Sequence, residues 1–111
     1  MDYKELLEVY LDYLHKIPNG CMIIAEKLRE DKLDVALNSI KDFSEGVLWL
    51  SEASELLKKQ NMNLTLNISQ IEEYLNEINE GLLKQDYILV ADMFEYEIEP
   101  FFKVLATSKV Q

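Results

Sequence analysis

The feature that most constrains the fold is an apolar residue that recurs every three or four positions through four long segments. In residues 2–30 this row continues without a slip, through Tyr3, Leu7, Tyr10, Leu14, Ile17, Cys21, Ile24 and Leu28. Such spacing is the heptad pattern of a helix that packs one side against other helices. Similar rows follow in residues 31–59, from 64–67 to 84, and in 87–107. The sequence predicts an all-α four-helix bundle that forms a single domain, residues 1–111.

Short polar segments separate these rows. The clearest runs from Gln60 to Asn63, and Gln85 with Asp86 makes a short corner. Asp31 and Asp86 are the predicted N-caps of the second and fourth helices, because a carboxylate accepts hydrogen bonds from the free N–H groups of a first turn. Short connections predict antiparallel neighbours in an up-down-up-down order. Helices of about 28 residues are about 42 Å long, so we expect an elongated bundle.

Both prolines fall inside predicted helices. Pro18 begins a Pro-Asn-Gly sequence that is typical of a turn, so the first segment could be two helices joined by a loop. The apolar row keeps its phase across this point, which favours one long helix kinked near Pro18. An interior proline costs about 3 kcal/mol, and each apolar side chain buried beyond it contributes about 1–3 kcal/mol. Pro100 should likewise kink the fourth helix without changing its phase.

The net charge of -10 restricts the classes of partner. Nucleic acids and anionic membranes are disfavoured, because binding to either relies on lysine and arginine. A basic protein segment would be attracted, although acidity also serves solubility alone. The N-terminal residues lack the basic and apolar regions of a secretory signal, and no run approaches the roughly 18 apolar residues of a membrane span. We therefore expect a cytoplasmic protein.

Residues with catalytic or metal-binding chemistry are scarce. The chain has one cysteine, Cys21, and one histidine, His15. A carboxylate-bridged di-metal bundle needs Glu-x-x-His pairs, and His15 has no such glutamate. Cys21 lies in the apolar row, where its thiol should be buried and inert. No glycine-rich phosphate loop or nucleophile elbow occurs. We predict no catalytic residues, no metal, no cofactor and no enzymatic activity.

A second apolar stripe lies roughly opposite the main row of the fourth segment. It consists of Leu89, Met93, Tyr96 and Pro100, at spacings of four, three and four. Exposed stripes of this kind mark partner surfaces or homodimer faces, unless neighbouring segments cover them. Glu97 falls at the edge of the apolar side. It is either an exposed rim carboxylate or an acceptor for a tyrosine or basic side chain on a neighbouring helix.

Trp49 also lies outside the main row of its segment. Val35 and Leu56 stand at heptad spacing from it, and Leu48 is adjacent. Tryptophan is common both in cores and at the energetic centres of interfaces. The two alternatives are a second contact between helices and a partner-binding residue.

Two segments resemble a known group of proteins. Residues 42–50 are similar to an E-G-L-x-W stretch, with Gly46 and Trp49 at matching positions. Residues 86–100 are similar to D-Y-x-L-x-A-D-x-x-x-Y-E-x-x-P; the matching positions are Asp86, Ala91, Asp92, Tyr96, Glu97 and Pro100. Both are found in small helical proteins of low-GC Gram-positive bacteria with no assigned function. The resemblance covers nearly the whole chain and implies a bundle but no activity.

Size, acidity and helical build are also similar to those of secretion and flagellar export chaperones, although no motif is shared and a fold does not define a function. The leading hypothesis is a non-catalytic protein-binding module, adaptor or chaperone-like, that holds a partner helix or peptide along Leu89, Met93 and Tyr96. The alternative is a structural homodimer that uses the same stripe and has no external client.

Overall fold

The computed structural model describes residues 2–62, 64 and 66–107, and this part of the chain is all-α, without a strand. Three long helices precede a fourth that is assigned in three consecutive pieces. The elements are α1 (Tyr3–Arg29), α2 (Leu33–Lys58), α3 (Ile68–Leu83), α4 (Tyr87–Met93), the π-helical segment η1 (Phe94–Ile98) and α5 (Glu99–Thr107). The predicted helical bundle is confirmed, and the helix boundaries lie within one or two residues of those expected.

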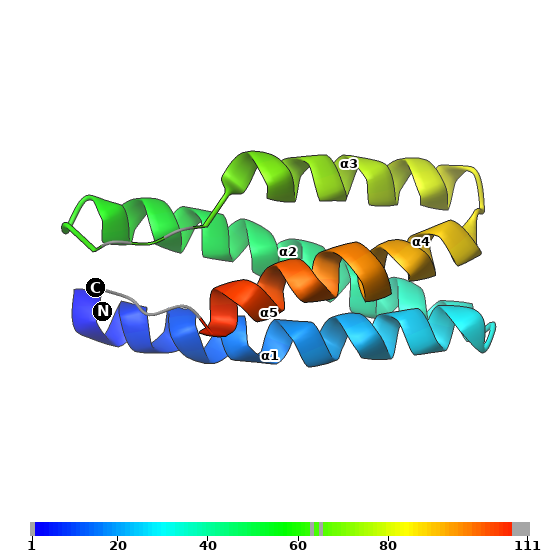
Figure 1. Cartoon of the computed structure of the whole chain (residues 1–111), viewed down its shortest axis with the longest axis horizontal. Helices are drawn as coiled ribbons and strands as arrows, with labels where there is room; N and C mark the ends of the chain where they lie inside the picture. The colour runs from blue at the N-terminus through cyan, green and yellow to red at the C-terminus, as the bar shows by residue number, and fades with distance from the viewer. Residues whose placement is uncertain (1, 63, 65, 108–111) are drawn as a thin grey trace.

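The helices lie side by side along an elongated molecule of 43 × 23 × 21 Å, and the chain reverses direction at each connection (Figure 1). α1 packs against α2 on one side and against the continuous helix α4–η1–α5 on the other. α3 lies on α4 and has few contacts with α2. Phe43 of α2 reaches the fourth helix, where its ring makes edge contacts with Phe94 and Phe102 at centroid distances of 5.1 and 6.1 Å.

α1 continues through Pro18 as one helix, as the unbroken apolar row predicted. The row is buried on both sides of the proline: Leu14 and Ile17 precede it, and Cys21 and Ile24 follow it. The hydrophobic energy of these side chains exceeds the cost of the hydrogen bond that proline cannot donate.

α1, α2 and α3 end in the same way, with a left-handed residue that is not glycine. Asp31, Asn61 and Gln85 have φ angles of 62°, 63° and 56°. After α1, the N–H of Lys32 donates to the carbonyl of Lys27 at 2.9 Å, the long-range bond of a Schellman turn. The prediction that Asp31 caps α2 is therefore wrong. Asp31 terminates α1, and Lys32 occupies the N-cap position without a side-chain bond.

The predicted N-termini of the third and fourth helices agree closely with the structure. Asp86 caps α4 as expected, because its carboxylate accepts from the N–H of Leu89 at 3.2 Å. α3 begins at Ile68, one residue after the expected interval, because Asn67 is its cap and accepts from the N–H of Gln70 at 3.1 Å.

The fourth helix changes phase just before Pro100, which contradicts the prediction of constant phase. The N–H of Glu99 donates to the carbonyl of Phe94, five residues earlier, as in a π-helix. The wider turn rotates the following residues relative to a regular helix. The regular spacing of four and three runs from Phe94 through Ile98 to Phe101 and predicts that Phe101 is buried. Instead Phe102 enters the core at 1% exposure, and Phe101 is only half-buried.

All three glycines lie inside helices, and two of them permit close contacts. A Cβ atom on Gly46 would collide with the hydroxyl and ring of Tyr13. A Cβ on Gly81 would lie 2.6 Å from a methyl group of Val90. Gly20 differs, because no atom lies within 4 Å of the position its Cβ would take.

This contrast predicts opposite effects of two alanine substitutions. Gly20→Ala should raise the free energy of unfolding by about 0.5–1 kcal/mol, because alanine favours a helix over glycine and meets no neighbour. Gly46→Ala should lower it by about 1 kcal/mol, since overpacking costs about 1–3 kcal/mol and displaces Tyr13. Urea unfolding followed by circular dichroism measures both. In a Tyr13→Ala background, Gly46→Ala should become stabilising; a stabilising effect in the wild-type background would contradict the assigned contact.

Candidate functional site

The stripe expected on the fourth helix is divided by the fold. Leu89 and Tyr96 are 47% and 67% exposed, but Met93 is buried at 3%. α3 lies on α4 and helps to cover Met93, while the π-turn changes the direction of the residues that follow. Met93 therefore does not belong to an exposed apolar stripe, and the expected surface of Leu89, Met93 and Tyr96 is not continuous.

Tyr96 and Pro100 are exposed. Near Tyr96, the guanidinium of Arg29 from α1 pairs with the carboxylates of Asp92 at 2.9 Å and Glu95 at 3.1 Å. The Glu95 carboxylate beside Tyr96 is the main cause of a raised pKa of the Tyr96 hydroxyl. These exposed ion pairs join α1 to the fourth helix.

Leu89, Met93 and Glu97 come together with α3 around a groove of about 300 Å³. Glu77, Glu80 and Gly81 of α3 line it, together with Lys84, the C-cap residue of that helix. Leu89 supplies exposed apolar surface, Met93 and Gly81 line the groove as buried residues, and three glutamates supply negative charge. Three of the six residues predicted to bind a partner thus share one site, the α3/α4 groove.

Contacts of Tyr74 and Gly81 hold α3 on the fourth helix beside this groove. The Tyr74 ring packs edge-on against Phe101 at 5.4 Å, and its hydroxyl donates to the backbone carbonyl of Glu97 at 3.5 Å. The close approach of Gly81 to Val90 brings the two helices together at another point. The tyrosine on this neighbouring helix thus binds the main chain of Glu97 and not its carboxylate. The Glu97 side chain is exposed, which agrees with the alternative of a rim carboxylate.

Negative side chains outnumber positive ones in the α3/α4 groove. The pKa of Glu77 is raised, first by desolvation and then by the carboxylates of Glu97, Glu73 and Glu80. Among the described residues that line the groove, only Lys84 is cationic. Repulsion among the glutamates is therefore incompletely compensated, and a bound cation would relieve it.

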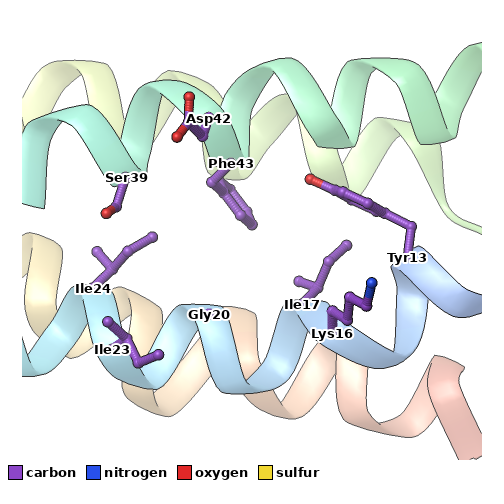
Figure 2. Close-up of a pocket in the computed structure, with 9 residues that line it drawn as sticks. All are labelled: Tyr13, Lys16, Ile17, Gly20, Ile23, Ile24, Ser39, Asp42 and Phe43. Atoms are coloured by element: carbon purple, nitrogen blue, oxygen red, sulfur yellow. The ribbon is translucent and has the colours of Figure 1, made fainter.

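A second cavity opens between α1 and α2, and the sequence did not predict it. It has a volume of about 280 Å³ and is lined by Tyr13, Lys16, Ile17, Gly20, Ile23, Ile24, Ser39, Asp42 and Phe43 (Figure 2). Figure 2 shows the Phe43 ring and the Ile17 and Ile24 side chains pointing into the gap between the helices, with Gly20 at its α1 side. Because Gly20 has no side chain and no neighbour, it leaves this space open.

Trp49 of α2 lies at the contact between the same two helices. Its indole packs edge-on against Tyr13 at 6.0 Å, and it is half-buried. Trp49 thus forms a second contact between helices and is also accessible from outside.

Neither Cys21 nor His15, the residues with potential chemistry, lines either cavity. Cys21 is buried, and desolvation, with a smaller contribution from Glu99, raises the pKa of its thiol to about 12. The Nδ1 atom of His15 lies 2.7 Å from the carbonyl of Leu11 on its own helix. Across residues 2–62, 64 and 66–107, no group of three or more His, Cys, Asp or Glu side chains is arranged to hold a metal ion. No helix in this part is long and apolar enough to cross a membrane.

Sequence reasoning missed every α3 residue of the groove and every α1 residue of the pocket. Glu77 and Glu80 were indistinguishable from other solvated glutamates, because the sequence does not reveal which helix α3 contacts. The signal that did exist was glycine: Gly20 and Gly81 are costly inside helices and therefore indicate close approach or open space.

Comparison with protein families places the chain in a family. The model described as "Domain of unknown function (DUF8042)" matches residues 5–108. The chain belongs to this family. This agrees with the resemblance to proteins without an assigned function. No curated protein and no solved structure matches the chain.

The division of the apolar stripe predicts unequal effects of truncation. Met93→Ala should lower the free energy of unfolding by about 2–5 kcal/mol, because it leaves a cavity in the core. Leu89→Ala should lower it by about 1 kcal/mol or less, since the side chain is half-exposed. Chemical denaturation compares the two variants. Equal, small effects would show that Met93 lies at the surface.

The crowding of carboxylates predicts an abnormal titration of Glu77. Its pKa in the folded protein should exceed its unfolded value, so its contribution to stability increases as the pH falls through the folded pKa. Glu97→Gln should shift the pKa of Glu77 downward, because it removes the largest of the charge contributions. Carbon-detected NMR of the side-chain carboxyl measures this value. Glu52→Gln, a substitution on α2, is the control and should leave it unchanged.

Proposed function

We propose that this protein is a non-catalytic protein-binding module, adaptor or chaperone-like, that holds a cationic amphipathic segment in the α3/α4 groove. The supporting observation is the combination of the exposed apolar side chain of Leu89 with the crowded carboxylates of Glu77, Glu80 and Glu97 around one groove. A partner helix with one apolar side chain flanked by lysine or arginine matches both properties. A net charge of -10 would also accelerate its approach.

The weak attachment of α3 to α2 supports a site at this position. α3 contacts α4 at Gly81 and the segments η1 and α5 at Tyr74, and it has few contacts with α2. A small movement of this one helix would therefore change the width of the groove. Helical partners commonly bind in apolar grooves between two helices, where anchors at spacings of three and four insert. Leu89, with the buried Met93 one turn further along, provides the apolar contact for one such anchor.

Two sequence-based expectations accompany this proposal. They are a cytoplasmic location and a family range in low-GC Gram-positive bacteria. Both follow from the composition and from the motifs around Trp49 and Tyr96, and neither alters the chemistry of the groove.

A synthetic peptide tests the proposal. The probe is a fluorescent amphipathic helix of about five turns built from leucine and lysine, and its affinity is measured by fluorescence anisotropy. The triple variant Glu77→Gln, Glu80→Gln and Glu97→Gln should weaken binding at least about tenfold, which corresponds to 1.4 kcal/mol. Leu89→Ser should weaken it as well, because it removes apolar contact while the charge is kept.

The matched control carries the same change in net charge elsewhere. Glu5, Glu8 and Glu52 are exposed residues of α1 and α2 outside the groove, and their substitution by glutamine should weaken binding much less. Added salt should reduce the affinity of the wild type more than that of the groove variant. Equal losses in the two triple variants would mean that the peptide senses only the overall charge, and the proposed site would be abandoned.

A further inference from the structure

A different face of the molecule combines apolar and charged residues in two parallel rows. Residues seven apart on a helix lie on the same side, so each row follows one helix. The α1 row is Val9, Lys16 and Ile23, and the α2 row is Val35, Asp42, Trp49 and Leu56. We call these the outer rows. Their apolar members are exposed, apart from the half-buried Trp49.

The outer rows flank the pocket between α1 and α2. Lys16 and Ile23 line it from α1, and Asp42 lines it from α2 (Figure 2). The residues that line this pocket come from these two helices alone, so neither α3 nor the fourth helix lines it. Gly20 keeps the space open at a cost of about 1 kcal/mol of helix propensity, with no close contact to explain its presence.

Antiparallel packing gives the two rows matching positions along the bundle. The contact between Tyr13 and Gly46 sets the relative level of α1 and α2. A step of seven residues forward on α1 then corresponds to a step of seven backward on α2. Three pairs of row residues consequently lie within about one helical turn of a common level: Val9 with Trp49, Lys16 with Asp42, and Ile23 with Val35.

This arrangement is self-complementary under a two-fold rotation about an axis parallel to the helices. Such a rotation places the α1 row of one copy against the α2 row of the other. Val9 then faces Trp49, Ile23 faces Val35, and each lysine faces an aspartate. We propose that the outer rows form the interface of a homodimer, with a second copy of this chain as the occupant of the face.

The charges of the face favour a second copy over other occupants. Its two rows present one lysine and one aspartate at the same level, whereas the α3/α4 groove is almost uniformly negative. In the described part of the chain, neither Lys16 nor Asp42 is in an ion pair. In a two-fold dimer, Lys16 of each copy pairs with Asp42 of the other copy, which gives two ion pairs. In each copy the exposed Ile23 side chain lies at the rim of the pocket between α1 and α2, where the apolar surface of the other copy can cover it.

This interface is distinct from the homodimer expected along Leu89, Met93 and Tyr96, since Met93 is buried. It uses α1 and α2 and does not depend on the groove proposed for a cationic partner. Salt also distinguishes the two: a dimer of two acidic chains should tighten as salt screens their net repulsion, whereas binding of a cationic peptide should weaken.

Light scattering of the full chain over a range of concentrations tests the proposal. The expected mass is twice the 13.0 kDa of the chain. Lys16→Asp and Asp42→Lys should each raise the dimer dissociation constant at least about tenfold. An equimolar mixture of the two variants should form a heterodimer with near wild-type affinity, because both cross-pairs then have opposite charges. The emission of Trp49, the single tryptophan, should shift to shorter wavelength on association.

The control pair, Lys41→Asp and Glu72→Lys, carries the same charge changes at exposed residues outside the rows and should leave the mass unchanged. A protein that is monomeric at every concentration overturns the proposal. So does a dimer that both row variants retain, because its interface then lies elsewhere. A monomer that binds anilinonaphthalene sulfonate, and loses the dye on Gly20→Leu, would assign the pocket to a small apolar molecule instead.

Discussion

The structure depends on the continuous apolar side of α1. Its buried residues pack against α2 on one flank and against the fourth helix on the other, so both neighbours take their positions from one uninterrupted helix. A break at Pro18 would separate these contacts into two independent halves. Burial of Ile17 and Cys21 on either side of the proline keeps the helix whole. Phe43 then links the two flanking helices directly, through edge contacts with Phe94 and Phe102.

α3 is the exception to this centred packing, and its position defines the candidate site. It meets α4 closely at Gly81 and the π-helical segment at Tyr74, with few contacts to α2. The surface of α4 that α3 leaves open becomes a groove, and the glutamates that keep the exterior of α3 solvated become its charged wall. A structural requirement for a polar exterior has thus placed negative charge beside the apolar surface of Leu89.

Features that depend on local periodicity, such as helix boundaries, could be predicted from the sequence. The burial of side chains that depends on contacts between helices could not. The helix boundaries and the Asp86 cap follow from rows and caps that are readable within one segment. Phe102, rather than Phe101, is buried because one π-turn before Pro100 rotates the helix, and a regular projection has no means of representing it. Met93 and Glu77 were misjudged or missed because their environment is set by which helix lies beside α4, a long-range choice that periodicity does not encode.

The environment of Cys21 gives the molecule a built-in reporter of its own opening. The thiol is fully enclosed near the middle of α1, and its pKa of about 12 leaves almost no thiolate at neutral pH. Alkylating reagents act on the thiolate. In the folded protein Cys21 is therefore protected from alkylation because the reagent cannot reach the buried sulfur and because the thiol stays protonated. Modification must then proceed through states in which α1 has separated from its neighbours. The rate of labelling at this one atom consequently measures how often the centre of the bundle comes apart, without any engineered probe.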